Sequence, residues 1–262
     1  MRWVRTLHEG QPAYAIVEDD TLVVIEGTPF TAHSRTSVRL PLASTRLLPP
    51  VIPPTFYAAG YNYAGHNAEA ATRISSAPVP ERPEPGYRAQ SALIGHGEAI
   101  VKPADYSGPF EAEAELVAVI GRDLRRRPGG CSRDEAAASV FGWTIGNDVS
   151  ARAWQRADRT FWRAKNSDTF KPMGPWIETE ADPLAATTIV TIDGVKTAEF
   201  PTGAMIFDPY DYIRTVSRYI TLRAGDVLWM GTDAMVEMPV GHVLGIEITG
   251  IGTLANPVTE EK

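Results

Sequence analysis

The amino-acid sequence predicts a β-rich α+β fold with mixed sheets. A small β-rich amino-terminal domain is expected over residues 1–50 and a main domain over 55–262. Short segments with apolar or alternating patterns recur along the chain, whereas segments with helix signals are few and short. Strands and helices do not alternate regularly and no internal repeat is present, so the main domain is predicted to be a β-roll with mixed sheets.

Composition and charge exclude several classes of function. Of the 262 residues, 44% are hydrophobic and 22% are charged, as in ordinary globular proteins. The net charge of −7 argues against nucleic-acid binding, and the basic run at 125–127 is interpreted as a solvated turn. The single cysteine, Cys131, allows no intramolecular disulfide and is typical of a reducing compartment. No segment resembles a signal peptide or membrane span, so we expect a cytoplasmic protein without a membrane partner.

The amino-terminal segment carries three short strand patterns separated by turns. They cover residues 3–8, 13–18 and 21–26, and Asp19-Asp20 supplies the turn between the last two. The proline pairs at 49–50 and 53–54 cannot continue a sheet or a helix. They predict a stiff linker, which places the start of the main domain near residue 55.

A histidine and a glutamate follow the first apolar segment of the main domain. His66 and Glu69 are three residues apart, so a single helical turn would place them on the same face. Glu69 would then orient His66 and raise its basicity, as a general base requires. The alternative is an exposed pair at a helix N-terminus. Residues 75–87 are rich in proline and lack a hydrophobic period, so they are predicted to form a loop and a candidate lid.

The central segment of the chain is an apolar run, 116–120, that begins directly after two glutamates. It is predicted to be a strand that is buried on both faces. Glu113 and Glu115 are two residues apart, so both carboxylates point to the same side of that strand. Two like charges at a half-buried place are costly unless a cation lies between them, and a hard divalent cation prefers oxygen ligands. The alternative is two solvated glutamates where a strand leaves a loop.

The next elements supply a third carboxylate. Ser132 and Glu135 have capping-box spacing and predict a short helix. The following strand, 140–148, ends at Asp148, which is either a third metal ligand or a residue that caps a turn or helix. The stretch 165–176 carries glycine and prolines and is predicted to be a loop.

The carboxyl-terminal third of the main domain completes the sheets. Residues 187–193 and 195–200 predict a hairpin with Asp193-Gly194 as its two-residue turn. A helix is expected from Pro209 to about Tyr219, followed by a strand at 227–230 and a final strand at 243–249. No phosphate-binding glycine loop, zinc-binding spacing or nucleophile elbow occurs in the sequence.

Taken together, these motifs resemble the fumarylacetoacetate hydrolase family over about residues 55–256. The ordered set, more than any single motif, carries the resemblance. Its members are Tyr61–His66 with Glu69, Glu113–Leu116 with Val119–Gly121, Asn147–Arg152 with Gln155, Lys165 with Asp168, Gly174–Trp176, Gly225-Asp226 and Gly231-Thr232. The amino-terminal segment also resembles the small β domain that often precedes this fold.

The resemblance implies a β-roll or β-sandwich main domain and a site for Mg²⁺ (or Mn²⁺ or Ca²⁺). By position, Glu113, Glu115 and Asp148 are the implied metal ligands. His66 and Glu69 are the implied water-activating pair. Lys165 is expected beside the substrate oxygens, where it would stabilise enolate or carboxylate charge. The implied substrate contacts or bracing residues are Arg152, Gln155 and Thr232.

The implied activity is metal-dependent hydrolysis of a carbon–carbon bond in an acylpyruvate or 1,3-dicarbonyl acid, through a metal-bound enolate, in the catabolism of aromatic or related compounds. The same ligands would serve an isomerase or decarboxylase of an unsaturated 2-oxo-diacid, because fold and metal do not select among these outcomes. A catalytically idle family member is the third alternative. The expected partners are a small oxo-acid substrate and a second copy in a homodimer.

Two departures from the family pattern lie where the protein would recognise the side groups of the substrate. The family often has a lysine ahead of its Ser-Ala-Leu segment, whereas Arg88 precedes Ser91 here. Arginine keeps the charge but not the compact ammonium, which affects an expected lid–substrate contact. The loop at 233–242 also differs, and its His242 is interpreted as a turn residue. Both changes point to an unusual or narrowed substrate, or alternatively to a paralogue with weak activity.

Overall fold

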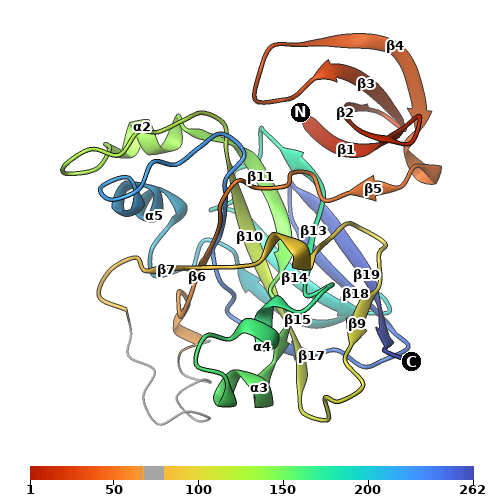
Figure 1. The fold of residues 1–262 in the computed structure, drawn as a ribbon, viewed down its shortest axis with the longest axis vertical. Helices are drawn as coiled ribbons and strands as arrows, with labels where there is room; N and C mark the ends of the chain where they lie inside the picture. The colour runs from red at the N-terminus through yellow and green to blue at the C-terminus, as the bar shows by residue number, and fades with distance from the viewer. Residues whose placement is uncertain (66, 68–79) are drawn as a thin grey trace.

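The computed structural model describes residues 1–65, 67 and 80–262, and it is built almost entirely from strands (Figure 1). In that part of the chain the strands form one fourteen-stranded sheet and one five-stranded sheet. The helices are short and lie around the edges of the sheets (Figure 1). The predicted fold class, a β-rich α+β protein with mixed sheets, is therefore confirmed.

The amino-terminal strands form a meander that joins the main sheet. The three predicted strands are present, and a fourth, which lacks a clear apolar pattern in the sequence, follows them. The first strand pairs with a strand of the main domain, with Trp3 opposite Ile177, so the two parts share one hydrogen-bonded sheet. The division of the chain into two domains near residues 50–55 stays a prediction. These strands are β1 (Arg2–His8), β2 (Gln11–Glu18), β3 (Thr21–Gly27), β4 (His33–Pro41) and the short β5 (Leu47–Leu48).

The central strand is β10 (Phe110–Ile120), and every residue in it is buried. It begins six residues earlier than the predicted apolar run, so the glutamates lie within the strand. The two faces of β10 have different neighbours. Ala114, Leu116, Ala118 and Ile120 belong to the largest hydrophobic cluster, which lies between the two sheets. The opposite face changes along the strand, from the glutamates at 111–115 to the buried valines at 117 and 119.

The neighbours of β10 bring distant parts of the chain to its two edges. β11 (Val140–Asn147) pairs antiparallel along one edge, and Ala114 lies opposite Asn147. The other edge pairs with β16 (Val227–Trp229). The remaining strands of this sheet are β6 (Phe56–Ala59), β7 (Pro85–Tyr87), β8 (Leu93–Ile94), β12 (Ser150–Ala151), β13 (Lys171–Glu178) and β17 (Met235–Glu237).

The five-stranded sheet contains the predicted hairpin. Asp193 and Gly194 both have positive φ angles, 49° and 79°, as a type I′ turn requires. The predicted strand at 243–249 is present, but it is not the last one, because another strand pairs with it antiparallel. The order in this sheet is β15 (Val195–Pro201), β14 (Thr187–Ile192), β18 (Val243–Ile248), β19 (Gly252–Glu260) and β9 (Ile100–Lys102).

Two predicted helices are present and have the expected N-terminal caps. α2 (Arg133–Ala137) starts with a complete capping box between Ser132 and Glu135. α5 (Pro209–Val216) starts at the cap Asp208 with proline in its first turn, but it ends three residues before the predicted Tyr219. In the described part of the chain, the α-helices α3 (Arg152–Ala157) and α4 (Trp162–Asn166) were not predicted.

The prediction of a loop over 165–176 is wrong. Lys165 lies in α4, and β13 covers most of the rest and pairs with both β1 and β11. The prolines suggested a loop because they cannot donate to a sheet. The sheet accommodates them with a register shift between Trp143 and Ile145 on β11, opposite this segment. The loop predicted at 75–87 contains β7 at its end, and residues 75–79 lie outside the described residues.

The packing between β11 and β16 gives a test of the fold. A Cβ added at Gly146 would lie 2.6 Å from ring carbon Cζ3 of the fully buried Trp229. We expect Gly146→Ala to lower the free energy of unfolding by about 1–3 kcal/mol, since overpacking forces side chains out of their preferred rotamers. Urea denaturation measures this loss. Gly60→Ala is the control, because a Cβ there meets nothing within 4 Å. Equal stability of the two variants would contradict this packing.

Among the described residues, no helix has both the length and the apolarity needed to cross a lipid bilayer.

Candidate active site

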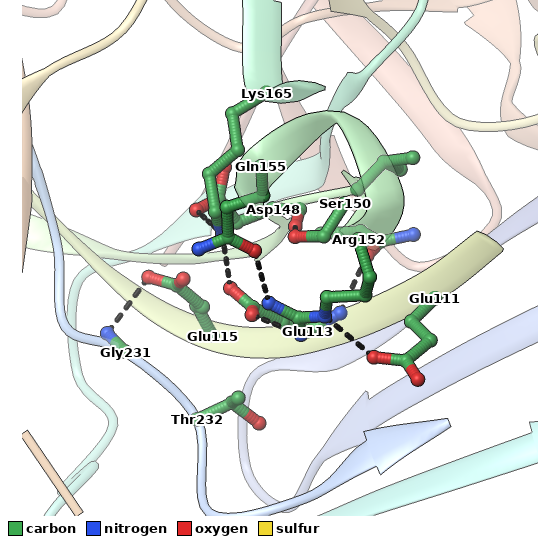
Figure 2. Close-up of polar contacts among 12 residues, drawn as sticks. Glu111, Glu113, Glu115, Asp148, Ser150, Arg152, Gln155, Lys165, Gly231 and Thr232 are labelled. Carbon is green, nitrogen blue, oxygen red and sulfur yellow. Dashed lines mark hydrogen bonds and ion pairs between the residues drawn. The ribbon is translucent and has the colours of Figure 1, made fainter. Parts of the chain in front are cut away.

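Three glutamates project from one face of β10, and two of them, Glu113 and Glu115, converge with Asp148. Glu111, Glu113 and Glu115 alternate with alanines, and their exposed fractions are 5%, 5% and 1%. Asp148 follows the end of β11, where its backbone N–H donates to the carbonyl of Glu113 (3.0 Å). Oxygens of Glu113, Glu115 and Asp148 lie within 4.8 Å of one another, and Figure 2 shows these side chains converging. The structure therefore brings the three predicted metal ligands together.

Asp148 is surrounded by three cationic side chains from separate segments. Arg88 binds it with two nitrogens, Nε to Oδ1 (3.0 Å) and Nη2 to Oδ2 (2.8 Å). Lys165 Nζ donates to Oδ2 (2.7 Å), and Lys171 Nζ lies 2.7 Å from Oδ1. Burial on its own raises the pKa of Asp148, but the charges of these three groups outweigh it and hold that pKa well below its ordinary value. Asp148 is therefore ionised at neutral pH.

Arg152 connects two of the glutamates. Its Nε donates to Glu111 Oε2 (2.6 Å) and its Nη2 donates to Glu113 Oε1. Its remaining nitrogen, Nη1, donates to Gln155 Oε1 (2.8 Å), one helical turn further along α3 (Figure 2). Lys165 Nζ occupies the other oxygen of Glu113, Oε2 (2.6 Å), so it bridges Glu113 and Asp148. Arg152 and Gln155 thus brace the carboxylates.

Glu115 has a different environment. Its Oε2 accepts a hydrogen bond from the backbone N–H of Gly231 (2.7 Å), and no described cationic side chain forms an ion pair with it. Burial, and then the charges of Asp148 and Glu113, raise its pKa well above the ordinary value. A buried carboxylate of this kind needs positive charge nearby to remain ionised at neutral pH.

Thr232 follows Gly231 and closes a local turn. Its Oγ1 donates to the carbonyl of Ala234 (2.9 Å) and accepts from the N–H of the same residue (3.3 Å). It also lines the cavity, so the predicted role at the substrate is compatible with its position. Its proposed contact with a substrate stays a prediction.

A cavity of about 250 Å³ opens onto the carboxylates. Its wall combines apolar and charged groups, as small-molecule sites do. Lys165, Arg88, Arg152 and Gln155 line this cavity, whereas Lys171 does not and lies behind Asp148. The other lining residues include Ala58, Ala59, Gly60, Tyr61, Asn62, Glu84, Gly86, Arg156, Phe161, Gly231, Thr232 and Met235.

The donor set fits a divalent cation such as Mg²⁺ or Mn²⁺. Three buried carboxylates from β10 and the end of β11 offer hard oxygen ligands at one point of the cavity wall. Burial, and then repulsion by Asp148 and Glu113, raise the pKa of Glu115, and a bound cation would offset both effects. The cluster can therefore hold a divalent metal, with Glu113, Glu115 and Asp148 as its protein ligands.

The structure also contains site residues that the sequence interpretation did not identify. Glu111 extends the alternating pattern of Glu113 and Glu115, so the period of two in the sequence could have identified it as a residue on the same face of the strand. Lys171 lies in a stretch interpreted as a loop, so nothing marked it as buried. Arg88 was expected at a lid–substrate contact, but its guanidinium binds Asp148. His66 and Glu69, the side chains predicted to act together as the general base, lie outside the described residues.

Comparisons with known proteins identify the class to which this fold and site belong. Residues 55–259 match the family described as fumarylacetoacetate (FAA) hydrolase, C-terminal, and residues 1–50 match the family described as Rv2993c-like, N-terminal. The chain belongs to the fumarylacetoacetate hydrolase family.

Three relatives illustrate the range of this family. Protein Rv2993c of Mycobacterium tuberculosis is 38% identical over 239 residues, which cover 89% of this chain and 86% of that protein. The oxaloacetate tautomerase YisK of Bacillus subtilis is 29% identical over 90% of this chain and 84% of its own length. The crystal structure described as 5-carboxymethyl-2-hydroxymuconate delta-isomerase from Mycobacterium smegmatis superposes with a TM-score of 0.87 and 34% identity, with 100% of both chains covered. The family thus includes hydrolases, tautomerases and isomerases.

Proposed function

We propose that this protein is a divalent-metal-dependent enzyme that forms the enolate of a 2-oxo or 1,3-dicarbonyl acid, and that it hydrolyses a carbon–carbon bond of an acylpyruvate-like substrate. The observation that supports this proposal is the convergence of Glu113, Glu115 and Asp148 at a cavity whose wall also carries Arg88, Arg152 and Lys165. Carboxylates that hold a cation and side chains that attract acids together suit a substrate with a carboxylate next to a carbonyl.

Each group has a distinct role in this proposal. A divalent cation held by the three carboxylates would act as a Lewis acid and polarise the carbonyl of the substrate. Lys165 Nζ, which is buried at the cavity wall, is placed to stabilise negative charge that develops on a substrate oxygen. Arg152 holds Glu113 in place through a hydrogen bond on one oxygen, while Gln155 holds Arg152. Hydrolysis also requires a base that activates water, and the pair His66–Glu69 stays the prediction for that base.

A second candidate is an isomerase, tautomerase or decarboxylase of a 2-oxo-diacid. The names of two relatives, an oxaloacetate tautomerase and a muconate delta-isomerase, favour this candidate. Tautomerisation and isomerisation both need proton transfer at an enolisable carbon, and neither needs water as a nucleophile. The same carboxylates and the same lysine would serve them.

The reaction can be identified by following the ultraviolet absorbance of enol forms with the purified protein, with Mg²⁺ and after removal of metal by EDTA. Mg²⁺-dependent loss of enolised acetylpyruvate with release of acetate and pyruvate supports the hydrolase. Faster equilibration of the enol and keto forms of oxaloacetate without product release supports the tautomerase, and release of CO₂ supports the decarboxylase. If Mg²⁺ changes none of these rates, the proposed enzyme activity is wrong for these substrates.

Two further expectations accompany this function. The homodimer inferred from the family resemblance stays a prediction, and light scattering during size-exclusion chromatography measures it. The expected cytoplasmic location likewise stays a prediction, which imaging of the tagged protein in its native cell tests.

A further inference from the structure

Asn62 is a buried polar residue for which the proposed reaction gives no role. Its exposed fraction is 1%, and it lies in the cavity wall, shortly after the end of β6. Its Nδ2 donates to the backbone carbonyls of Phe207 (2.9 Å) and Met230 (2.9 Å), and its Oδ1 accepts from the N–H of Phe207 (3.0 Å). Both N–H groups of the amide are used in these contacts, so Asn62 has no donor left for a substrate. It instead links the segment after β6 with those that precede α5 and follow β16.

The contact between Asn62 and Met230 has a counterpart at the metal site. The carbonyl of Met230 and the N–H of Gly231 belong to one planar peptide group. That N–H donates to Oε2 of Glu115 (2.7 Å; Figure 2). The peptide group is therefore held at its oxygen by Asn62 and at its nitrogen by the carboxylate. A hydrogen bond accepted by the carbonyl also polarises the peptide group, which makes its N–H a better donor.

Local backbone preferences do not fix the orientation of this peptide group. Gly231 has a φ angle of 83°, and glycine adopts positive and negative φ angles about equally well. The N–H of Met230 donates to the carbonyl of Leu116 on β10 (3.0 Å), but it belongs to the preceding peptide group. The group between Met230 and Gly231 can therefore rotate unless a tertiary contact holds its carbonyl, and Asn62 makes that contact.

We propose that Asn62 is a positioning residue that fixes the orientation of the metal ligand Glu115 through the peptide group between Met230 and Gly231. The inference rests on the proposed metal site and deepens it, since it assigns a role in metal binding to a residue that contributes no ligand atom. The other two predicted ligands are oriented by ion pairs with arginine and lysine side chains. For Glu115 the corresponding contact is the N–H of Gly231, whose direction depends on Asn62.

The test compares the binding of Mn²⁺ to the metal-free wild type and to metal-free Asn62→Ala. Electron paramagnetic resonance detects free Mn²⁺ and gives the Kd. We expect the Kd to rise at least tenfold in the variant, because loss of a group that orients a metal ligand typically weakens metal binding about 10–100-fold. The frozen-solution spectrum of bound Mn²⁺ should also change, because it depends on the arrangement of the ligand oxygens. A folded Asn62→Ala with the spectrum of the wild type and a Kd within about twofold of it would overturn the inference.

Asn256→Ala is the matched control. Asn256 is 2% exposed, and its Nδ2 likewise donates to two backbone carbonyls, those of Gly95 (2.8 Å) and Glu98 (2.8 Å). It lies on β19 in the five-stranded sheet and does not line the cavity. Urea denaturation should show that both variants lose stability, whereas only Asn62→Ala should lose affinity for Mn²⁺. An equal loss of affinity in the two variants would reduce the effect of Asn62 to a general loosening of the fold and overturn the inference.

A second variant keeps the test decisive if Asn62→Ala does not fold. Asn62→Asp has nearly the same shape and still accepts from the N–H of Phe207, but it cannot donate to two carbonyls. It should weaken Mn²⁺ binding in the same way, and an unchanged Kd and spectrum would overturn the inference.

The binding measurement also separates the inference from the proposed reaction. It needs no turnover, so weaker binding by Asn62→Ala in a protein that acts on none of the substrates above supports the inference and contradicts only the reaction. Failure of the wild type to bind Mn²⁺, with or without oxalate, would overturn both the metal site and the role of Asn62.

Discussion

Replacing Glu115 with glutamine is expected to stabilise the protein and to lower its metal-dependent activity strongly. Glutamine keeps an oxygen that accepts from the N–H of Gly231, but it removes a buried charge that lies beside Asp148 and Glu113. We expect the free energy of unfolding to rise by about 1–2 kcal/mol, in line with other functional residues that are held at a cost in stability. Loss of a metal ligand should lower kcat/KM roughly a hundredfold to a thousandfold.

The effect of Glu115→Gln on stability should depend on pH in a defined direction. Because the pKa of Glu115 is raised in the folded state, the wild type gains stability as the pH falls through that raised pKa. The gain is complete below the unfolded-state value of about 4.5, and it is lost again as the pH rises. The advantage of the variant should therefore grow as the pH rises through that raised pKa and vanish in acid.

Urea denaturation of both proteins across this pH range measures the difference. Glu199→Gln, at an exposed pair with Lys196, is the control and should show little change. A variant that is less stable than the wild type at neutral pH would contradict our description of Glu115 as a buried carboxylate whose ionised form is disfavoured by burial and by Asp148 and Glu113.

Replacing Asp148 with asparagine is expected to have the opposite effect on stability. The variant would leave Arg88, Lys165 and Lys171 around a neutral amide, and removal of one partner from a buried ion network typically costs about 3–5 kcal/mol. The pKa of Asp148 is held well below its ordinary value of 3.8, so the wild type keeps this stabilisation above that value and loses it only as the pH falls through the lower folded-state pKa. The destabilisation should thus be present in full at neutral pH.

The comparison with Glu115→Gln makes this a sharp test. Both variants neutralise a buried carboxylate of the same cluster, yet one should raise the free energy of unfolding and the other should lower it. Asp193→Asn is the control, because Asp193 is exposed in the hairpin turn and asparagine is also favoured at a positive φ angle. Equal stability of Asp148→Asn and the wild type would show that the three cations do not depend on Asp148.

Local signals in the sequence predicted much of the fold. The capping box of Ser132 and Glu135, the Asp193-Gly194 turn and the apolar run at 116–120 each depend on neighbours within a few residues, and the structure contains all three elements. The loop predicted at 165–176 is wrong for the converse reason. Its proline and glycine content suggests a loop, but pairing with β1 and β11 determines its conformation, and those strands are distant in sequence.

The candidate site could be predicted only in part for the same reason. The alternation of Glu113 and Glu115 and the place of Asp148 at a strand end are visible in the sequence, and the family resemblance selected Asp148 as a ligand and added Lys165. The charges that compensate these groups come from Arg88, Arg152 and Lys171, which lie in three separate segments of the chain. Which cation faces which carboxylate depends on the tertiary arrangement, so the sequence alone did not reveal that Lys171 is buried behind Asp148.

The most direct test of the central claim is a titration of the metal-free protein with Mn²⁺, followed by electron paramagnetic resonance, which detects free Mn²⁺. We predict that the wild-type protein binds one Mn²⁺ per chain and that Glu115→Gln, although folded and more stable, loses this binding. Equal binding of Mn²⁺ by the two proteins, or no binding by the wild type even with oxalate present, would contradict a metal site formed by Glu113, Glu115 and Asp148.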